Sequence, residues 1–121
     1  MSFKPILFIN VAKDLNSIAK TEESYRSVAN RAYYGAFGYL KDKLDFPDYG
    51  PSCHQNLINI FKFSEDKESK IVGKKLEALL EMRKKADYRY HEEFKDHTSQ
   101  YCIQEAEKII ELFDNLDQDT E

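Results

Sequence analysis

The chain has 121 residues, the size of a single domain, and its 41% hydrophobic and 33% charged residues are typical of a folded globular protein. Four glycines, three prolines and two cysteines are too few for a collagen-like, low-complexity or disulfide-stapled chain. A net charge of −4 does not by itself indicate nucleic-acid binding.

The charge is unevenly distributed along the chain. Seven acidic residues and one lysine give residues 105–121 a charge of −6, which leaves +2 on residues 1–104. The basic side chains are densest at Lys74, Lys75, Arg83, Lys84, Lys85 and Arg89. This distribution is compatible with a polyanionic partner, although a run of charge is more often a solvated face.

The sequence predicts a cytoplasmic protein that neither spans a membrane nor binds a metal or other cofactor. No apolar run approaches the ~18 residues that a spanning helix needs, and the apolar start of the chain is broken at Asn10 and followed by Lys13 and Asp14. The two cysteines and the histidines lack the spacing of metal ligands.

Helical periodicity predominates, and no segment alternates with period two for long enough to predict a strand. Ser52 and Gln55 have the form of a capping box at the start of the third helix. The predicted helices cover residues 5–20, 23–44, 52–63, 68–85 and 99–116. The predicted fold is an all-α, antiparallel up-and-down four-helix bundle with one additional short helix, formed by residues 1–116 and followed by an acidic tail at 117–121.

Two glycines inside the second predicted helix, Gly35 and Gly38, each cost about 1 kcal/mol relative to alanine. Close approach of another backbone is the simplest reason for them. That backbone belongs either to a neighbouring helix of the bundle or to a second subunit, and the sequence does not distinguish the two.

Arg83 continues the apolar stripe of the fourth predicted helix, so it faces the core or a cleft. Asp87 lies four residues later, at ion-pair spacing on the same face. The pair is either a structural staple or an anion site in which Asp87 holds Arg83 ready for a phosphate.

The three histidines differ in their surroundings. His91 follows a run of cations and a carboxylate, which makes it a candidate general acid or base. His54 is interpreted as a packing or capping residue and His97 as an exposed one.

Three segments together resemble HEPN domains (higher eukaryotes and prokaryotes nucleotide-binding) over roughly residues 5–116. The first is Asn-Arg-Ala-Tyr-Tyr-Gly-Ala-Phe at 30–37, the second is His54 with the apolar residues that follow it, and the third is Arg-Lys-Lys-Ala-Asp-Tyr at 83–88. Each motif alone is weak, but their order and spacing within one small helical chain are fairly specific.

The resemblance implies a helical bundle that forms a homodimer. Many HEPN proteins are metal-independent endoribonucleases, often toxins paired with a nucleotidyltransferase antitoxin or components of phage defence. Their signature is an arginine followed after four to six residues by a histidine, with the site completed across the dimer. Arg83 matches the arginine, whereas seven residues separate it from His91. Some members are instead catalytically inactive modules that bind a partner protein or a nucleotide, and a plain helical homodimer is a third alternative.

The resemblance also implies roles in RNA cleavage. The RNA 2′-hydroxyl would attack the adjacent phosphorus, His91 would transfer protons and Arg83 would stabilise the added negative charge. The supporting residues are Asp87, Tyr88, Arg31 and Tyr34, and the residues expected to hold RNA are Lys84, Lys85, Arg89 and Tyr90.

Overall fold

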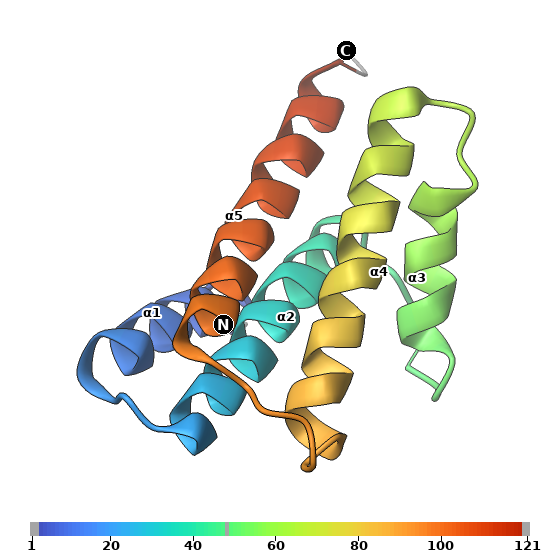
Figure 1. The fold of residues 1–121 in the computed structure, drawn as a ribbon. Helices are drawn as coiled ribbons and strands as arrows, with labels where there is room; N and C mark the ends of the chain where they lie inside the picture. Colours follow the sequence, from blue (N-terminus) through green and yellow to red (C-terminus); the bar gives the residue numbers. More distant parts are fainter. Residues whose placement is uncertain (1–2, 48, 120–121) are drawn as a thin grey trace.

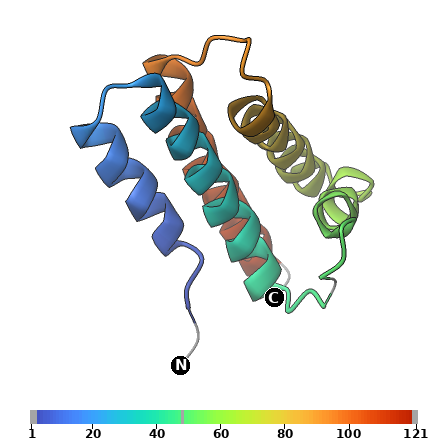
Figure 2. The ribbon, with the colours of Figure 1, turned by 90° about the horizontal axis from the view of Figure 1, so that it is seen from below.

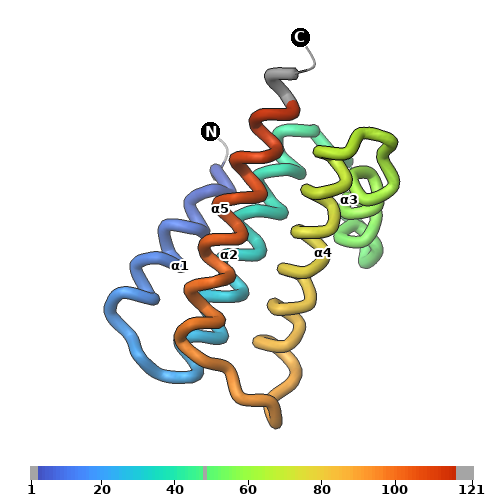
Figure 3. The backbone as a smooth tube through the Cα atoms, turned by 45° about the horizontal axis from the view of Figure 1, so that its top comes forward, coloured from blue at the N-terminus to red at the C-terminus, as the bar shows by residue number. Residues whose placement is uncertain are grey.

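The computed structural model describes residues 3–47 and 49–119, with side chains described up to Leu116. Within these residues the chain forms five α-helices and no strand, which confirms the predicted all-α class. The four longer helices, α1, α2, α4 and α5, run in alternating directions along the chain (Figures 1 and 3). Seen from below, α1 and α3 lie on opposite sides of the molecule, with α2, α4 and α5 between them (Figure 2).

The observed helix bounds agree with the periodicity to within a few residues. They are α1 Leu7–Ile18, α2 Glu22–Lys43, α3 Cys53–Lys62, α4 Lys67–Tyr88 and α5 Asp96–Asp119. The largest differences are at the end of α4 and at both ends of α5, each of which extends three residues beyond the expectation. Asp87 and Tyr88 are therefore helical. The predicted acidic tail includes residues 120–121 and the side chains of 117–119, which lie outside the described part of the chain.

Side-chain caps define two helix starts. Thr21 accepts a hydrogen bond from the backbone N–H of Ser24 at the start of α2, and Asp66 accepts one from that of Ser69 at the start of α4. The capping box predicted at Ser52 is wrong, because its side chain makes no capping hydrogen bond. The Gln55 side chain reaches forward to Asn59 instead of back to Ser52.

Helix α2 is the centre of the core, because it packs against α1, α4 and α5. Its buried residues form one broad face and include Val28, Ala29, Ala32, Tyr33, Ala36, Phe37 and Leu40. Small residues on this face let the neighbouring helices approach closely. Tyr33 is the largest fully buried side chain, and its hydroxyl is therefore placed inside the bundle.

The two glycines of α2 face α1 and the residues directly before it in the same chain. A Cβ added at Gly35 would lie 2.4 Å from Ile9 Cγ1, and one added at Gly38 would lie 2.5 Å from Pro5 Cβ. The sequence left open whether the close backbone belongs to the same bundle or to a second subunit, and the structure shows that it belongs to the same bundle. These glycines therefore do not support a contact with a second subunit.

A closer backbone approach joins α3 to α4. A Cβ added at Gly73 would lie 2.4 Å from the backbone nitrogen and 2.7 Å from the Cα of Lys62. Backbone atoms cannot rotate away as a side chain can, so this contact fixes how closely α3 lies against α4.

We expect Gly73→Ala to destabilise the fold by about 1–3 kcal/mol, because the methyl group forces α3 away from α4. The sign of this change in the free energy of unfolding is informative, since alanine normally stabilises a helix interior by about 1 kcal/mol relative to glycine. Urea denaturation would measure the free energy of unfolding, with Lys74→Ala at the next, exposed position as the control. A Gly73→Ala protein as stable as the wild type would contradict the contact.

Candidate functional site

Arg83 and Asp87 form a partly buried ion pair on α4. Arg83 Nε donates to Asp87 Oδ2 at 2.8 Å, and the two side chains are 13% and 21% exposed. Asn30 of α2 donates from Nδ2 to the same carboxylate oxygen at 3.1 Å. Both Asp87 and α2 therefore take part in holding Arg83, as expected for a guanidinium on an apolar stripe.

The Arg83 guanidinium also lies against two aromatic rings. Its Cζ is 5.2 Å from the centre of the Tyr34 ring and 5.7 Å from that of Tyr88, and Nη2 donates to the Tyr88 hydroxyl at 3.3 Å. Among the described residues, Nη1 makes no hydrogen bond. A guanidinium held in this way keeps donors for an anion that approaches from outside.

Arg83 stays charged in this setting. Burial opposes its charge, but the hydrogen bond that Arg83 donates to Asp87 and the electrostatic interactions with Tyr34, Asp87 and Tyr88 outweigh that effect, so the pKa of Arg83 lies above its usual value. The site therefore presents a fixed positive charge.

An open cavity of about 540 Å³ lies between α3 and the C-terminal half of α4, and Arg83 is part of its wall. Three of the lining side chains are cations, and none of the described residues that line it is acidic. The lining residues are Pro51, His54, Gln55, Leu80, Arg83, Lys84, Tyr88 and Arg89. This combination of cations with a tyrosine and a histidine suits a phosphate with an attached base.

His54 belongs to this cavity, in addition to being a packing residue. It lies in the first turn of α3, its Nδ1 is 2.7 Å from the Tyr33 hydroxyl, and its ring stacks on Phe37 with centroids 4.2 Å apart. Burial, and then the charges of Arg83 and Lys84, lower the pKa of His54 below its usual value. The imidazole is therefore neutral at neutral pH.

His91 is placed differently. It is exposed in the turn of the connector that joins α4 to α5, and it does not line the cavity that Arg83 lines. Within one chain the structure thus brings Arg83 together with His54 and does not bring it together with His91 in this cavity. The seven-residue spacing allows this, because α4 ends at Tyr88 and the chain then turns away.

The other predicted site residues divide into three groups. Lys84, Tyr88 and Arg89 line the cavity with Arg83, while Asp87 and Tyr34 contact Arg83 without being part of the cavity wall. Arg31 donates to Asn30 and lines a separate cavity with Arg26, Ser27, Asn30, Ala86 and Asp87. Lys85 and Tyr90 do not line the cavity with Arg83, and Tyr90 is 75% exposed.

Arg26 is a positioning residue that the sequence analysis missed. From α2 it donates to the carbonyls of Lys85 and Ala86 at 3.0 Å each, and it also bonds to the carbonyls of Arg89 and Glu92. These carbonyls lie at the end of α4 and in the connector, where a helix runs out of backbone N–H donors, and two of them, of Lys85 and Arg89, also accept from the backbone N–H groups of Arg89 and Glu92. Arg26 therefore fixes the end of α4, where Asp87 and Tyr88 lie. Helical spacing indicates only its pairing with Glu22, because the carbonyls that it holds are about sixty residues away.

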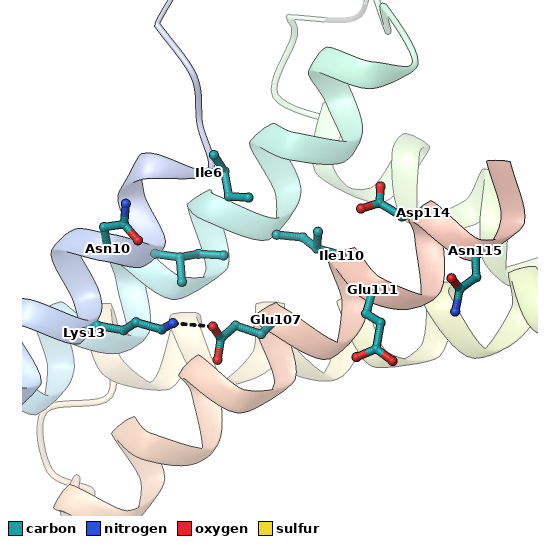
Figure 4. Close-up of a pocket in the computed structure, with 9 residues that line it drawn as sticks. Ile6, Asn10, Lys13, Glu107, Ile110, Glu111, Asp114 and Asn115 are labelled. Carbon is teal, nitrogen blue, oxygen red and sulfur yellow. Dashed lines mark ion pairs between the residues drawn. The ribbon is translucent and has the colours of Figure 1, made fainter. Parts of the chain in front are cut away.

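A second open cavity, of about 440 Å³, lies between α1 and α5 (Figure 4). Ile6, Ile9 and Ile110 form its apolar wall, and Lys13 pairs with Glu107 across it (Figure 4). Glu111 and Asp114 add further negative charge, so its character is opposite to that of the cavity beside Arg83.

The described residues contain neither a metal-binding cluster nor a membrane-spanning helix. No group of three or more histidines, cysteines or carboxylates there is placed to hold a metal ion. None of the helices in the described part combines the length and apolarity that crossing a bilayer requires.

Comparison with known proteins gave one match. The family model of the HEPN domain matches residues 11–116, which contain all the residues of the cavity beside Arg83. No curated protein and no solved structure matches the chain.

We expect the Arg83–Asp87 pair to be energetically coupled. A double-mutant cycle with Arg83→Ala and Asp87→Ala should give a coupling energy of about 1 kcal/mol or more, because both charges are partly withdrawn from water. The exposed pair Lys108–Glu111, with side chains 48% and 64% exposed, is the matched control and should couple by less than about 0.5 kcal/mol. Additive effects at positions 83 and 87 would contradict the ion pair.

Proposed function

Because the chain belongs to the HEPN family, we propose that it is a metal-independent endoribonuclease that uses the substrate's own 2′-hydroxyl as the nucleophile. The observation that carries the proposal is the setting of Arg83. Its guanidinium is held by Asp87, keeps free donors and lines an open cationic cavity. A fixed guanidinium is suited to stabilising the extra negative charge on a five-coordinate phosphorus.

The rest of the cavity wall supplies groups for the flanking RNA. Lys84 and Arg89, which line the cavity and pair with Glu81, would contact phosphates on either side of the reacting one, and the Tyr88 ring, 64% exposed, is available to stack on a base. Phosphate contacts of this kind do not read sequence, so the cavity favours single-stranded RNA with little base preference.

A toxin role is part of the proposal. Family resemblance supports an intracellular RNA-cleaving toxin, neutralised by a nucleotidyltransferase partner or deployed in phage defence. A homodimer would complete the site, because the exposed His91 of one copy is accessible to a second copy.

A catalytically inactive module that binds a partner protein or a nucleotide is the second candidate. The observation that favours it is the position of His91, which does not line the cavity with Arg83. Under this alternative the cavity would hold a phosphate without cleaving it.

We expect the purified protein to cleave single-stranded RNA in EDTA and to leave 2′,3′-cyclic phosphate and 5′-hydroxyl ends. DNA of the same sequence should resist, since it lacks the 2′-hydroxyl. Arg83→Ala should lower the rate by ~10² or more, and Arg83→Lys should restore it only in part, because lysine keeps the charge and loses the planar fork.

Gel analysis of end-labelled RNA would measure these rates, with the exposed α4 variant Lys74→Ala as the control. Circular dichroism would verify that each variant is folded. RNA binding without cleavage by the wild type would favour the binding module, and cleavage unaffected by Arg83→Ala would contradict the proposed site.

We expect the protein to be a homodimer in solution. Light scattering should give about twice the monomer mass of 14.2 kDa. A monomer at concentrations of tens of micromolar, roughly the range in which weak association becomes detectable, would contradict a site shared between two copies.

A further inference from the structure

His54 and Arg83 face one cavity from two helices that lie side by side. Both side chains line its wall, His54 from the first turn of α3 and Arg83 from α4. The Tyr34 ring contacts both, with its centre 5.8 Å from that of the His54 ring and 5.2 Å from Arg83 Cζ. A phosphate bound at Arg83 would therefore lie in the same open cavity as the His54 imidazole.

One ring nitrogen of His54 is already engaged, and the other is free for a ligand. Nδ1 shares a hydrogen bond with the Tyr33 hydroxyl at 2.7 Å, whereas Nε2 has no hydrogen bond to any described residue. A phenol hydroxyl accepts as well as donates, so it can partner Nδ1 whether or not that nitrogen carries a proton. Burial raises the pKa of Tyr33 far above its usual value, so the phenol stays neutral.

The position of the ring is fixed by packing. Phe37 stacks on one face at 4.2 Å, and the Gly73 contact holds α3 against the helix that carries Arg83. Proton transfer requires a group held in a fixed position, and the packed His54 ring meets this requirement better than His91, which lies in an exposed turn.

We propose that His54, rather than His91, exchanges the proton with the RNA 2′-hydroxyl, and that Tyr33 is a positioning residue that orients its ring. This inference rests on the ribonuclease function proposed above. The proposal takes the histidine of the site from α3, whereas the arginine–histidine signature would take it from the residues that follow Arg83 in the sequence.

The chemistry balances without a further reactant. His54 Nε2 takes the proton of the 2′-hydroxyl while Nδ1–H donates to the Tyr33 hydroxyl. The freed oxygen forms a bond to phosphorus, the bond from phosphorus to the 5′-oxygen breaks, and the departing 5′-oxygen takes a proton from water. The hydroxide so formed is neutralised by the proton that the imidazolium releases. Arg83 compensates the charge that passes through the phosphorus centre.

The surroundings of His54 also predict a pH dependence. The groups that face it are Tyr33 and Tyr34 from α2 and Arg83, Lys84, Tyr88 and Arg89 from α4. Burial, and then Arg83 and Lys84, lower the pKa of His54, so the base form persists below the pH at which an exposed histidine protonates. Activity should fall with decreasing pH only below that point.

The experiment compares His54→Gln, His91→Gln and the exposed control His97→Gln on one single-stranded RNA in EDTA. We expect His54→Gln to lower kcat by ~10² or more with RNA affinity, measured by fluorescence anisotropy, changed less than about threefold. His97→Gln should cleave at the wild-type rate. Tyr33→Phe, which removes only the hydroxyl, should shift the acid limb of the profile of kcat/KM against pH, and His54→Gln should abolish that limb.

The possible outcomes distinguish a failure of the ribonuclease function from a failure of the His54 assignment alone. Wild-type protein that binds RNA and never cleaves it overturns the ribonuclease function, and this inference with it. Wild-type cleavage that survives His54→Gln overturns the assignment of His54 alone, whatever the effect of His91→Gln. If His54→Gln does not fold, the pH profile of Tyr33→Phe decides: an unchanged acid limb overturns the inference.

Discussion

The site depends on one constraint, the need to neutralise a guanidinium on the apolar stripe of α4. Arg83 would be costly there without a partner. Asp87, one turn later, supplies the charge, and Asn30 from α2 donates to the same carboxylate, so the ion pair also joins two helices. Asp87 accepts from Nε and the Tyr88 hydroxyl from Nη2, so Nη1 is the donor group of this cavity-lining guanidinium that has no partner among the described residues. The interaction that makes Arg83 tolerable in the bundle thus also sets the direction in which it can bind an anion.

The fold could be predicted from the sequence because each helix carries its own periodic apolar face, and that signal is local. The ends of the helices were less accurate. Residues 88–97 have no clear period, and the end of α4 is held by Arg26, whose partners are about sixty residues away in the chain. The capping box at Ser52 failed for a related reason. A matching pair of residue types permits a cap, but the backbone at the end of the loop decides whether it forms.

The candidate site could be predicted only where its contacts are local. Arg83 and Asp87 are four residues apart on one helix, so their pairing follows from helical spacing. The nearness of His54 to Arg83 depends on how tightly α3 packs on α4, which Gly73 allows through a backbone contact that no spacing reveals. The segment around His54 resembles HEPN domains, yet nothing in its sequence indicates which side chains His54 faces. The cations and the carboxylate that precede His91 in the sequence make it a candidate acid or base, but the turn after Tyr88 leaves it exposed.

The net charge of the chain does not show that its two main cavities carry charges of opposite sign. The acidic residues Glu107, Glu111 and Asp114 line the cavity between α1 and α5, whereas the cavity beside α3 is lined by cations with no described carboxylate. The first cavity is lined in part by α1 and the second in part by α3, and these two helices lie on opposite sides of the molecule (Figure 2). Since charges farther apart than about 8–10 Å are largely screened at physiological ionic strength, a polyanion at the α3–α4 side responds mainly to the cavity-lining cations Arg83, Lys84 and Arg89 and to the carboxylates paired with them, which are those of Glu81, Asp87 and Glu92. A chain with a net charge of −4 can therefore present a cationic cavity to RNA.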